Sequence, residues 1–311
     1  MIEIDSLTKN YGHHRVVDNL TFGCDAGEVL GFLGPNGAGK TTTMRMITGF
    51  VTPTSGRASV CGHDIEEDSL AARQRLGYLP EGAPCYPEMT PGAFLDFVAS
   101  IRQLEGSKRN ERLDDVIGTL HLEPVLNQTI ETLSKGFQRR VGLAQAILHD
   151  PDVLILDEPT DGLDPNQKYE VRELIRSMAA EKLIVISTHI LEEVEAVCNR
   201  VIIISEGRIL ADDSPQRLAA SSRYHNAVRI GLADGDKFDE IRAAIERLAS
   251  VRTTESDRDH YAITAIAADG REPWRDVSDL IAENGWQVSS VQLEAGRLDE
   301  VFRQITGGAA A

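Results

Sequence analysis

Short apolar runs alternate with amphipathic stretches along the first two thirds of the chain. The runs hold four or five residues each, which suits strands buried on both faces of a parallel sheet, and they span 29–33, 76–79, 153–156, 183–187 and 201–205. Helical periodicity covers much of the intervening sequence, over about 91–148, 168–180 and 191–198. Three further strands are expected at 2–4, 16–22 and 58–60. This alternation predicts an α/β fold in which helices cover a parallel sheet.

The pattern changes after residue 220. Strand, helix, strand, strand, helix, strand and a closing helix are expected at 228–232, 237–249, 251–254, 261–267, 274–283, 287–293 and 298–305. The order is similar to the split β-α-β-β-α-β arrangement of ferredoxin-like domains. We therefore expect two domains, a larger one over residues 1–220 and a small α+β accessory or regulatory domain over 223–311. Residues 307–311 are expected to fray.

Composition narrows the class of protein. The chain of 311 residues is 41% hydrophobic and 26% charged, as in ordinary globular proteins, and its net charge of −17 lacks the electrostatic footprint of a nucleic-acid binder. The apolar runs are too short to cross a bilayer, and Glu3 and Asp5 interrupt what would be a signal peptide. Four scattered cysteines without a C-x-x-C pair indicate reduced thiols in a cytoplasmic protein.

Residues 34–41 match the phosphate-binding template G-x-x-x-x-G-K-[ST], between an apolar run and an expected helix. Glycines let backbone N–H groups turn toward an anion, and the helix adds its positive N-terminal end. Lys40 is expected to reach the β- and γ-phosphates, and the Thr41 hydroxyl to bind Mg²⁺. A nucleoside triphosphate is thus predicted to bind Gly34, Pro35, Asn36, Gly37, Ala38, Gly39, Lys40, Thr41 and Thr42.

Two adjacent carboxylates, Asp157 and Glu158, end the apolar run 153–156. Successive strand residues point to opposite sides, so Asp157 is expected to support Mg²⁺ while Glu158 faces the attacking water. His189 follows the run 183–187 and is expected to contact the γ-phosphate and that water. The alternatives are solvated acids at a strand end and a structural histidine.

The segment 133–140 opens a helix at Ser134, which offers a second anion site. Because one nucleotide does not need two anion sites on one chain, two chains are expected to face each other, each lending Ser134 and Gly136 to the partner's γ-phosphate. Asp164 lies in a loop expected to point toward that partner. Taken alone, Ser134 is more often a plain helix cap.

In their order and spacing, these motifs resemble the ATP-binding cassette (ABC) family, specifically a transporter's nucleotide-binding subunit, over about residues 2–220. The resemblance implies a P-loop NTPase fold with a parallel sheet core, an antiparallel β subdomain and a helical subdomain at about 82–150. It also implies ATP and Mg²⁺ as cofactors and an ATP-sandwich homodimer. Separate polytopic membrane subunits would hold the chain at the inner face of the cell membrane. Tyr11 would stack on adenine, unless it is only a surface tyrosine.

Two motifs depart from the family pattern, at three positions. Lys135 and Phe137 replace a glycine and the glutamine of the usual Leu-Ser-Gly-Gly-Gln signature. Glu81 stands where relatives commonly have a glutamine that contacts Mg²⁺. A carboxylate there can serve the metal but repels phosphate oxygens, so we expect slow turnover without a partner.

Segments 77–81, 86–90 and 298–302 are similar to those of ABC-2-type exporters, including gliding-associated and multidrug-type ATPases. By this resemblance, residues 84–97 would form part of the groove that receives a membrane subunit's cytoplasmic helix; the alternative is that these residues are only local packing. Two other functions stay open: a soluble ABC ATPase acting on nucleic acid or the ribosome, and a nucleotide-gated regulatory module. The motifs do not identify a cargo.

Overall fold

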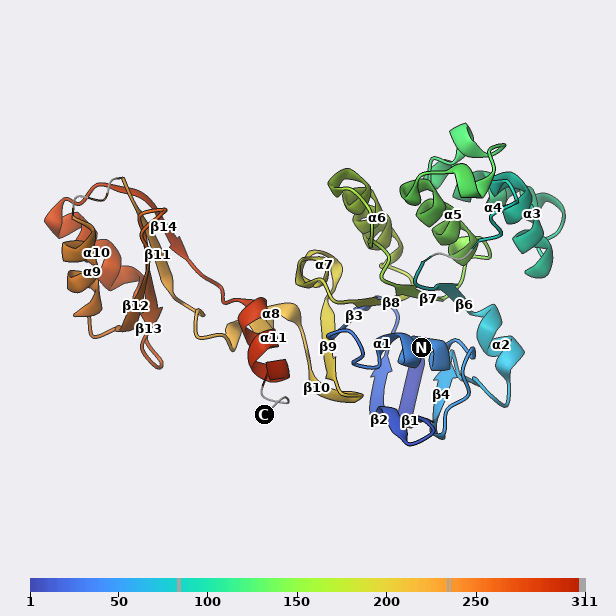
Figure 1. The fold of residues 1–311 in the computed structure, drawn as a ribbon, viewed down its shortest axis with the longest axis horizontal. Coiled ribbons are helices and arrows are strands. Elements are labelled where there is room, and N and C mark those ends of the chain that lie inside the picture. Colours follow the sequence, from blue (N-terminus) through green and yellow to red (C-terminus); the bar gives the residue numbers. More distant parts are fainter. Residues whose placement is uncertain (83–84, 234, 236, 308–311) are drawn as a thin grey trace. The chain divides into compact units, whose positions relative to one another are not determined.

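The computed structural model describes residues 1–82, 85–233, 235 and 237–307. The chain forms two compact units, Met1–Asp212 and Asp213–Ala311 (Figure 1). Of the end that was expected to fray, only Gly307 is among the described residues, and it closes the last helix.

A six-stranded sheet forms the centre of the first unit (Figure 1). Its strands follow the order β10-β9-β3-β8-β7-β6, with bounds Arg208–Asp213, Arg200–Ser205, Val29–Leu33, Leu183–Thr188, Val153–Asp157 and Leu76–Leu79. The pairs from β9 through β6 are parallel. Every residue of β3, β6, β7 and β8 is buried, which explains why these strands are continuous apolar runs in the sequence. The predicted parallel core is confirmed.

An antiparallel sheet of order β2-β1-β4-β5 makes up the second layer of this unit, with bounds His14–Cys24, Ile2–Tyr11, Ser55–Val60 and His63–Asp64. β1 and β2 are longer than expected. Ser6 and Asn19 adopt positive φ angles of 53° and 55°, near shifts in the strand register, so the pairing continues past them. Helix α1 (Lys40–Ile47) packs between the two sheets and buries Met44 and Met46 there (Figure 1).

Three helices that pack on one another form the helical part of the first unit (Figure 1): α3 (Pro91–Ile101), α4 (Gly106–Thr119) and α5 (Lys135–Ile147). The remaining helices are α2 (Ser69–Gln74), α6 (Pro165–Met178) and α7 (Leu191–Val197). Helix α6 begins three residues before its expected start, because Asp164 caps it and Pro165 occupies its first turn.

The second unit contains a four-stranded sheet of order β12-β13-β11-β14, antiparallel throughout. Its strands are Val251–Asp257, Ala262–Ala267, Val228–Leu232 and Val288–Leu293, and α9 (Phe238–Glu246) and α10 (Trp274–Asn284) share one apolar core with the sheet. This order matches the expected ferredoxin-like arrangement.

Two short helices, α8 (Pro215–Ala220) and α11 (Leu298–Gly307), complete the second unit and pack on each other. Gly296, with a φ of 111°, lies so close to the backbone of Ala219 that a side chain would collide with it. Glu300 is only 7% exposed, and its side chain accepts hydrogen bonds from Ser222 Oγ and Arg223 N. These contacts group α8 with the second unit, whereas the sequence analysis divided the chain between residues 220 and 223.

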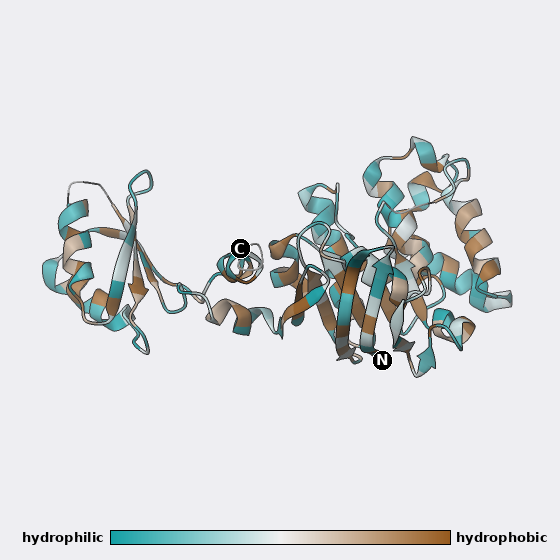
Figure 2. Cartoon of the chain, turned by 60° about the horizontal axis from the view of Figure 1, so that its bottom comes forward, coloured by the Kyte–Doolittle hydropathy of each residue, from teal (hydrophilic) through white to brown (hydrophobic). Residues whose placement is uncertain are grey.

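Hydropathy follows this architecture. Figure 2 shows polar and apolar bands alternating along exposed strands of the first unit, as in β1, where Ile2 and Ile4 are buried and Glu3 and Asp5 are exposed. Within the described ranges, no helix combines the length and the apolar character that crossing a bilayer requires.

Candidate active site

The loop from Gly34 to Gly39 joins the end of β3 to the first turn of α1. Gly39 has a φ of 103°, and a Cβ there would lie 2.7 Å from the Val16 carbonyl oxygen. At Gly34 a Cβ would collide with the carbonyl of Ile204. Because no side chain caps α1, its first N–H groups are available to an anion. The sequence places glycine where both backbone conformation and space require it.

Lys40 folds back onto this loop. Its Nζ donates to the carbonyl oxygens of Gly34, at 2.7 Å, and Pro35, at 3.2 Å. The side chain is 7% exposed. Burial lowers the pKa of Lys40 from its ordinary value, and the nearby charges of Glu158, Asp157 and Glu81 oppose that shift. The ammonium is thus held at the loop where phosphates were predicted.

Asp157, the last residue of β7, is fully buried beneath the loop. Its Oδ1 accepts a hydrogen bond from Ser187 Oγ and lies 3.5 Å from Thr41 Oγ1. Its Oδ2 is buried without a hydrogen-bond partner. Burying a carboxylate oxygen without a hydrogen-bond donor costs free energy unless a cation binds it. The Asp157 oxygens therefore fit a hard divalent cation.

The described residues contain no group of three or more His, Cys, Asp or Glu side chains placed to hold a metal. Magnesium is commonly held by one or two carboxylates together with substrate phosphates and water. Asp157 and Thr41 supply that kind of partial ligand set.

Glu158 leaves the strand in a left-handed conformation, with a φ of 49°. Its Oε1 lies 3.0 Å from His189 Nδ1, and its Oε2 accepts from Thr188 Oγ1 at 3.4 Å. Its backbone N–H donates to the Ser187 carbonyl oxygen at 2.9 Å. The two carboxylates therefore diverge, as expected, but a turn at Glu158 separates them rather than strand alternation. Backbone strain of this kind often occurs at functional sites.

A cavity of about 380 Å³ joins the loop to the acidic residues. Lys40, Thr41, Glu81, Glu158 and His189, five of the residues singled out from the sequence, share its wall. Its complete lining is Val16, Asn36, Gly37, Gly39, Lys40, Thr41, Thr42, Glu81, Glu158, Asp161 and His189. Tyr11 is not part of this lining; it ends β1, is 50% exposed and has Lys9 Nζ 5.2 Å from its ring centroid.

Ser134, Gly136 and Asp164 are also absent from that cavity lining. Ser134 Oγ caps α5 by accepting from Phe137 N at 3.3 Å. Asp164 and Gln167 form a capping box at the start of α6, and the Gln167 side chain lies against Gly136. The second predicted anion site is therefore a separate cluster at the starts of α5 and α6.

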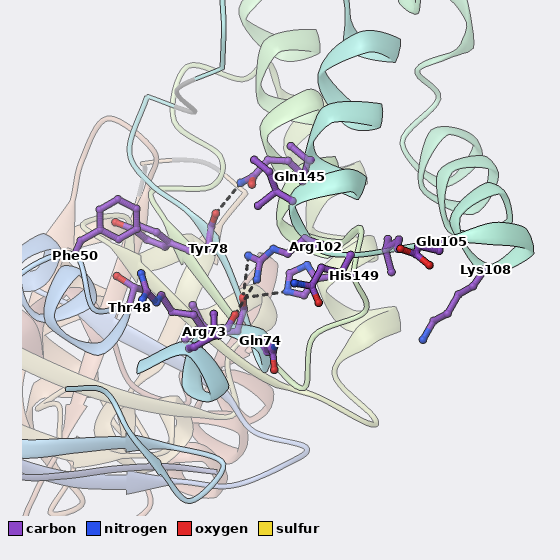
Figure 3. Close-up of a pocket in the computed structure, with 16 residues that line it drawn as sticks. Thr48, Phe50, Arg73, Gln74, Tyr78, Arg102, Glu105, Lys108, Gln145 and His149 are labelled. Carbon is purple, nitrogen blue, oxygen red and sulfur yellow. Dashed lines mark hydrogen bonds between the residues drawn. The ribbon is translucent and has the colours of Figure 1, made fainter. Parts of the chain in front are cut away.

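A second cavity, of about 730 Å³, lies beside α3 and β6 (Figure 3). The sequence predicts that residues 84–97 form part of a docking groove; Pro84 lies outside the described residues, and 85–97 do not line this cavity. Tyr86 and Phe97 instead meet edge to face, 5.7 Å between ring centroids. The lining comprises Thr48, Phe50, Leu70, Arg73, Gln74, Leu76, Tyr78, Val98, Ile101, Arg102, Gln103, Leu104, Glu105, Lys108, Gln145 and His149.

Sequence reasoning missed two residues that support the site from outside the cavity, Ser187 and Arg139. Ser187 is hidden within an apolar strand, and nothing local marks its bond to Asp157. Arg139 is 5% exposed and donates to backbone carbonyls beside Glu158. The helical spacing could have predicted that Arg139 is buried, because it lies three residues after Gly136 and four before Leu143, on the buried face of α5.

Comparison with known proteins agrees with this geometry. The ABC transporter family model matches residues 17–161. Nod factor export ATP-binding protein I of Paraburkholderia xenovorans is 38% identical over 79% of this chain and 82% of that protein. This chain belongs to the ABC transporter family. As the motifs predicted, it is an ATP-binding ATPase subunit of that family.

Two further relatives extend the match. The daunorubicin/doxorubicin resistance ATP-binding protein of Streptomyces peucetius is 33% identical over 98% of this ABC chain and 92% of that protein, so the likeness includes the C-terminal unit. A solved structure described as the ATP-binding subunit of an ABC transporter is 30% identical, with a TM-score of 0.66, over 71% of this chain and 92% of that one. The predicted ABC fold is confirmed.

Proposed function

We propose that this chain is the ATP-hydrolysing subunit of an ABC-2-type exporter and that it works as an ATP-sandwich homodimer on separate membrane subunits. The observation that carries the proposal is a divided site. The phosphate loop and the Glu158–His189 pair line one cavity, and Asp157 is buried beside Thr41, while Ser134 and Gly136 lie elsewhere on the same chain.

The chemistry follows from this arrangement. Lys40 would exchange the carbonyls of Gly34 and Pro35 for the phosphates of ATP. Thr41 and Asp157 would hold Mg²⁺, with Glu81 near its shell, and when bound the ion supplies charge neutralisation of the phosphate oxygens. Glu158 would accept a proton from the attacking water, and His189 would hold the Glu158 carboxylate and contact the γ-phosphate.

A second copy would complete the site. Ser134 caps α5, and the free N–H groups of that helix start form a site for the partner's γ-phosphate. Asp164 caps α6 and lies near Gly136, because Gln167 pairs with Asp164 in the capping box and its side chain packs against Gly136. Tyr11, half exposed at the end of β1, is available to stack on adenine. ATP would thus close two subunits, and hydrolysis would release them.

The cavity beside α3 and β6 is the proposed docking site for the cytoplasmic helix of a membrane subunit (Figure 3). Three of its lining side chains, Phe50, Leu70 and Ile101, are 72%, 68% and 62% exposed. Exposed apolar groups gathered around one concavity favour an amphipathic partner helix. Tyr78 lies on β6 and lines this groove, and Glu81, which follows β6, lines the 380 Å³ cavity that is proposed to bind ATP. Movement of β6 when a helix docks would therefore be transmitted to the nucleotide site.

Export and location are part of the proposal. Two relatives carry the words export and drug resistance in their names, and we infer the same direction of transport here. The chain would lie in the cytoplasm and would be held at the inner face of the cell membrane by its membrane subunits. Those subunits would select the cargo. Residues 223–311 would form an accessory or regulatory domain.

Purification of the tagged chain with detergent-extracted membranes tests this function. We expect a polytopic membrane protein to co-purify in equal stoichiometry and to raise the ATPase rate above that of the isolated chain. Salt-sensitive binding to nucleic acid or ribosomes, without a membrane partner, would favour the soluble alternative. ATP-dependent dimers without turnover in the wild type would favour the nucleotide-gated module.

A further inference from the structure

The guanidinium of Arg139 is buried in α5 and aimed at the end of β7. Its Nη2 donates to the Asp157 carbonyl oxygen at 3.3 Å, and its Nε donates to the Pro159 carbonyl oxygen at 3.0 Å. The two acceptors immediately flank Glu158. One planar side chain therefore holds the backbone on both sides of the carboxylate that faces the ATP cavity.

This contact matters because Glu158 adopts a backbone conformation that a glutamate rarely takes. Its φ of 49° lies in the left-handed region, which costs free energy unless the surroundings hold it. The Glu158 N–H is fixed by the Ser187 carbonyl, and the carbonyls before and after it are fixed by Arg139. Without the guanidinium, only the contact to β8 would remain of these three backbone restraints.

The surroundings are also electrostatically suited to a buried cation. Burial lowers the pKa of Arg139, while the charges of Asp161, Asp157, Glu158 and Glu81 oppose that shift. Burying an arginine for packing alone would be costly. Here the charge lies next to the acidic side of the ATP cavity, where it offsets repulsion among the carboxylates.

We propose that Arg139 is a positioning residue for hydrolysis: it holds the strained turn at Glu158 and ties that turn to helix α5. The proposal rests on the proposed role of Glu158. Because Ser134 caps the same helix, a shift of α5 upon contact with a partner's nucleotide would be transmitted by Arg139 to the Glu158 of its own chain. Each ATP site would thereby respond to occupancy of the other.

The neighbouring Arg140 provides a matched control. It has the same charge on the same helix, but it pairs with Glu170, donates to the Leu120 carbonyl at 3.4 Å and lies 5.4 Å from the Phe137 ring centroid. These contacts face α6 and the end of α4 rather than β7. Arg140→Gln removes one charge from α5 and leaves both backbone bonds beside Glu158 in place.

The experiment compares Arg139→Gln, Arg139→Lys and Arg140→Gln for kcat, for KM and for the Kd of a fluorescent ATP analogue. We expect Arg139→Gln to lower kcat about tenfold, as loss of a charged hydrogen bond implies, with Kd within about twofold because Arg139 does not line the cavity. Arg139→Lys should recover part of the rate, and Arg140→Gln should keep it. Unchanged kcat in Arg139→Gln, an equal loss in Arg140→Gln, or a parallel rise in Kd would overturn the proposal.

A second comparison separates this proposal from the function on which it rests. In a Glu158→Gln background, adding Arg139→Gln should change the residual rate less than about twofold, since the arginine acts through Glu158. A further tenfold loss there would show that Arg139 acts independently and would overturn the proposal. If Glu158→Gln itself keeps full activity, the proposed role of Glu158 fails first. If Arg139→Gln does not fold, Arg139→Lys is used instead, because a lysine cannot donate to both carbonyls in the geometry of the guanidinium. A kcat of Arg139→Lys equal to that of the wild type, at unchanged Kd, would overturn the proposal.

Discussion

His189 Nδ1 lies 3.0 Å from Glu158 Oε1, although the two residues belong to different loops that follow adjacent strands of the central sheet. The Glu158 side chain is 12% exposed and that of His189 46%, so the pair meets at the wall of the ATP cavity with the carboxylate on the inner side. A water molecule next to this carboxylate would find an acceptor held in one orientation.

Replacing the Glu158 carboxylate with an amide is expected to stop hydrolysis and preserve binding. A general base contributes about 10²- to 10⁴-fold to rate, so Glu158→Gln should lower kcat by at least about 100-fold while the loop from Gly34 to Thr42 still holds ATP. Steady-state ATPase assays and light scattering with and without ATP would measure both effects. ATP-dependent dimers should accumulate. Persistent turnover, or failure to bind ATP, would contradict the assignment.

Glu81 is expected to restrain the isolated subunit. It lines the cavity that also contains Glu158 and Asp161, so it adds negative charge where phosphates would bind. Glu81→Gln should therefore raise basal ATPase activity, by several-fold, at saturating Mg²⁺ and ATP. A wild-type rate equal to or above that of the variant would refute this role. Glu88→Gln, an exposed substitution on the same connection, serves as the control.

The features that the sequence predicted correctly are those encoded by a local pattern of residues. The loop from Gly34 to Thr41 and the carboxylates Asp157 and Glu158 are each encoded by adjacent residues; part of the loop and Glu158 line one cavity, and Asp157 lies 3.5 Å from Thr41 Oγ1. The sequence did not predict β10, whose residues alternate between exposed and half-buried and so lack an apolar run. Nor did it predict the bond from Ser187 to Asp157, since partners 30 residues apart meet only through strand pairing.

The cavity of about 730 Å³ was not predicted, for a related reason. Its lining comes from α2, β6, α3, α4 and α5 and from the segments that follow α1, α3 and α5, which are far apart in sequence. A surface assembled from several elements leaves no continuous pattern to detect. Phe50 and Tyr78, for example, come within 5.6 Å between ring centroids although 28 residues separate them.

A charge in this groove is expected to uncouple the subunit from its membrane partner. Ile101 is 62% exposed and lines the cavity, so Ile101→Glu would place a carboxylate against an apolar helix without disturbing the core. The variant should lose co-purification of the membrane subunit and keep the basal ATPase rate. Leu210→Glu, at an exposed position on β10 outside this lining, should retain the partner. Equal retention by both variants would argue against docking at the groove.

His149 is expected to make the first unit sensitive to acid. Burial, followed by the charge of Arg102, lowers the pKa of His149 to about 4; its Nε2 contacts the Leu76 carbonyl oxygen at 3.1 Å, and its Nδ1 is buried without a partner. The folded pKa lies below the unfolded value of about 6.5. Between the two values the unfolded chain binds more protons, so stability is fully present above about pH 6.5 and falls as the pH drops toward 4.

At pH 5.5 this linkage is expected to lower the free energy of unfolding by about 1 kcal/mol relative to pH 7.5. His149→Gln keeps a donor for the Leu76 carbonyl but does not titrate, so it should remove that share of the pH dependence. Urea unfolding of the first unit, followed by far-ultraviolet circular dichroism, would measure it. Both tryptophans, Trp274 and Trp286, lie in the second unit, so the transition seen by their fluorescence should be the same in variant and wild type. An unchanged pH dependence of the first unit in His149→Gln would show that another group carries the acid sensitivity.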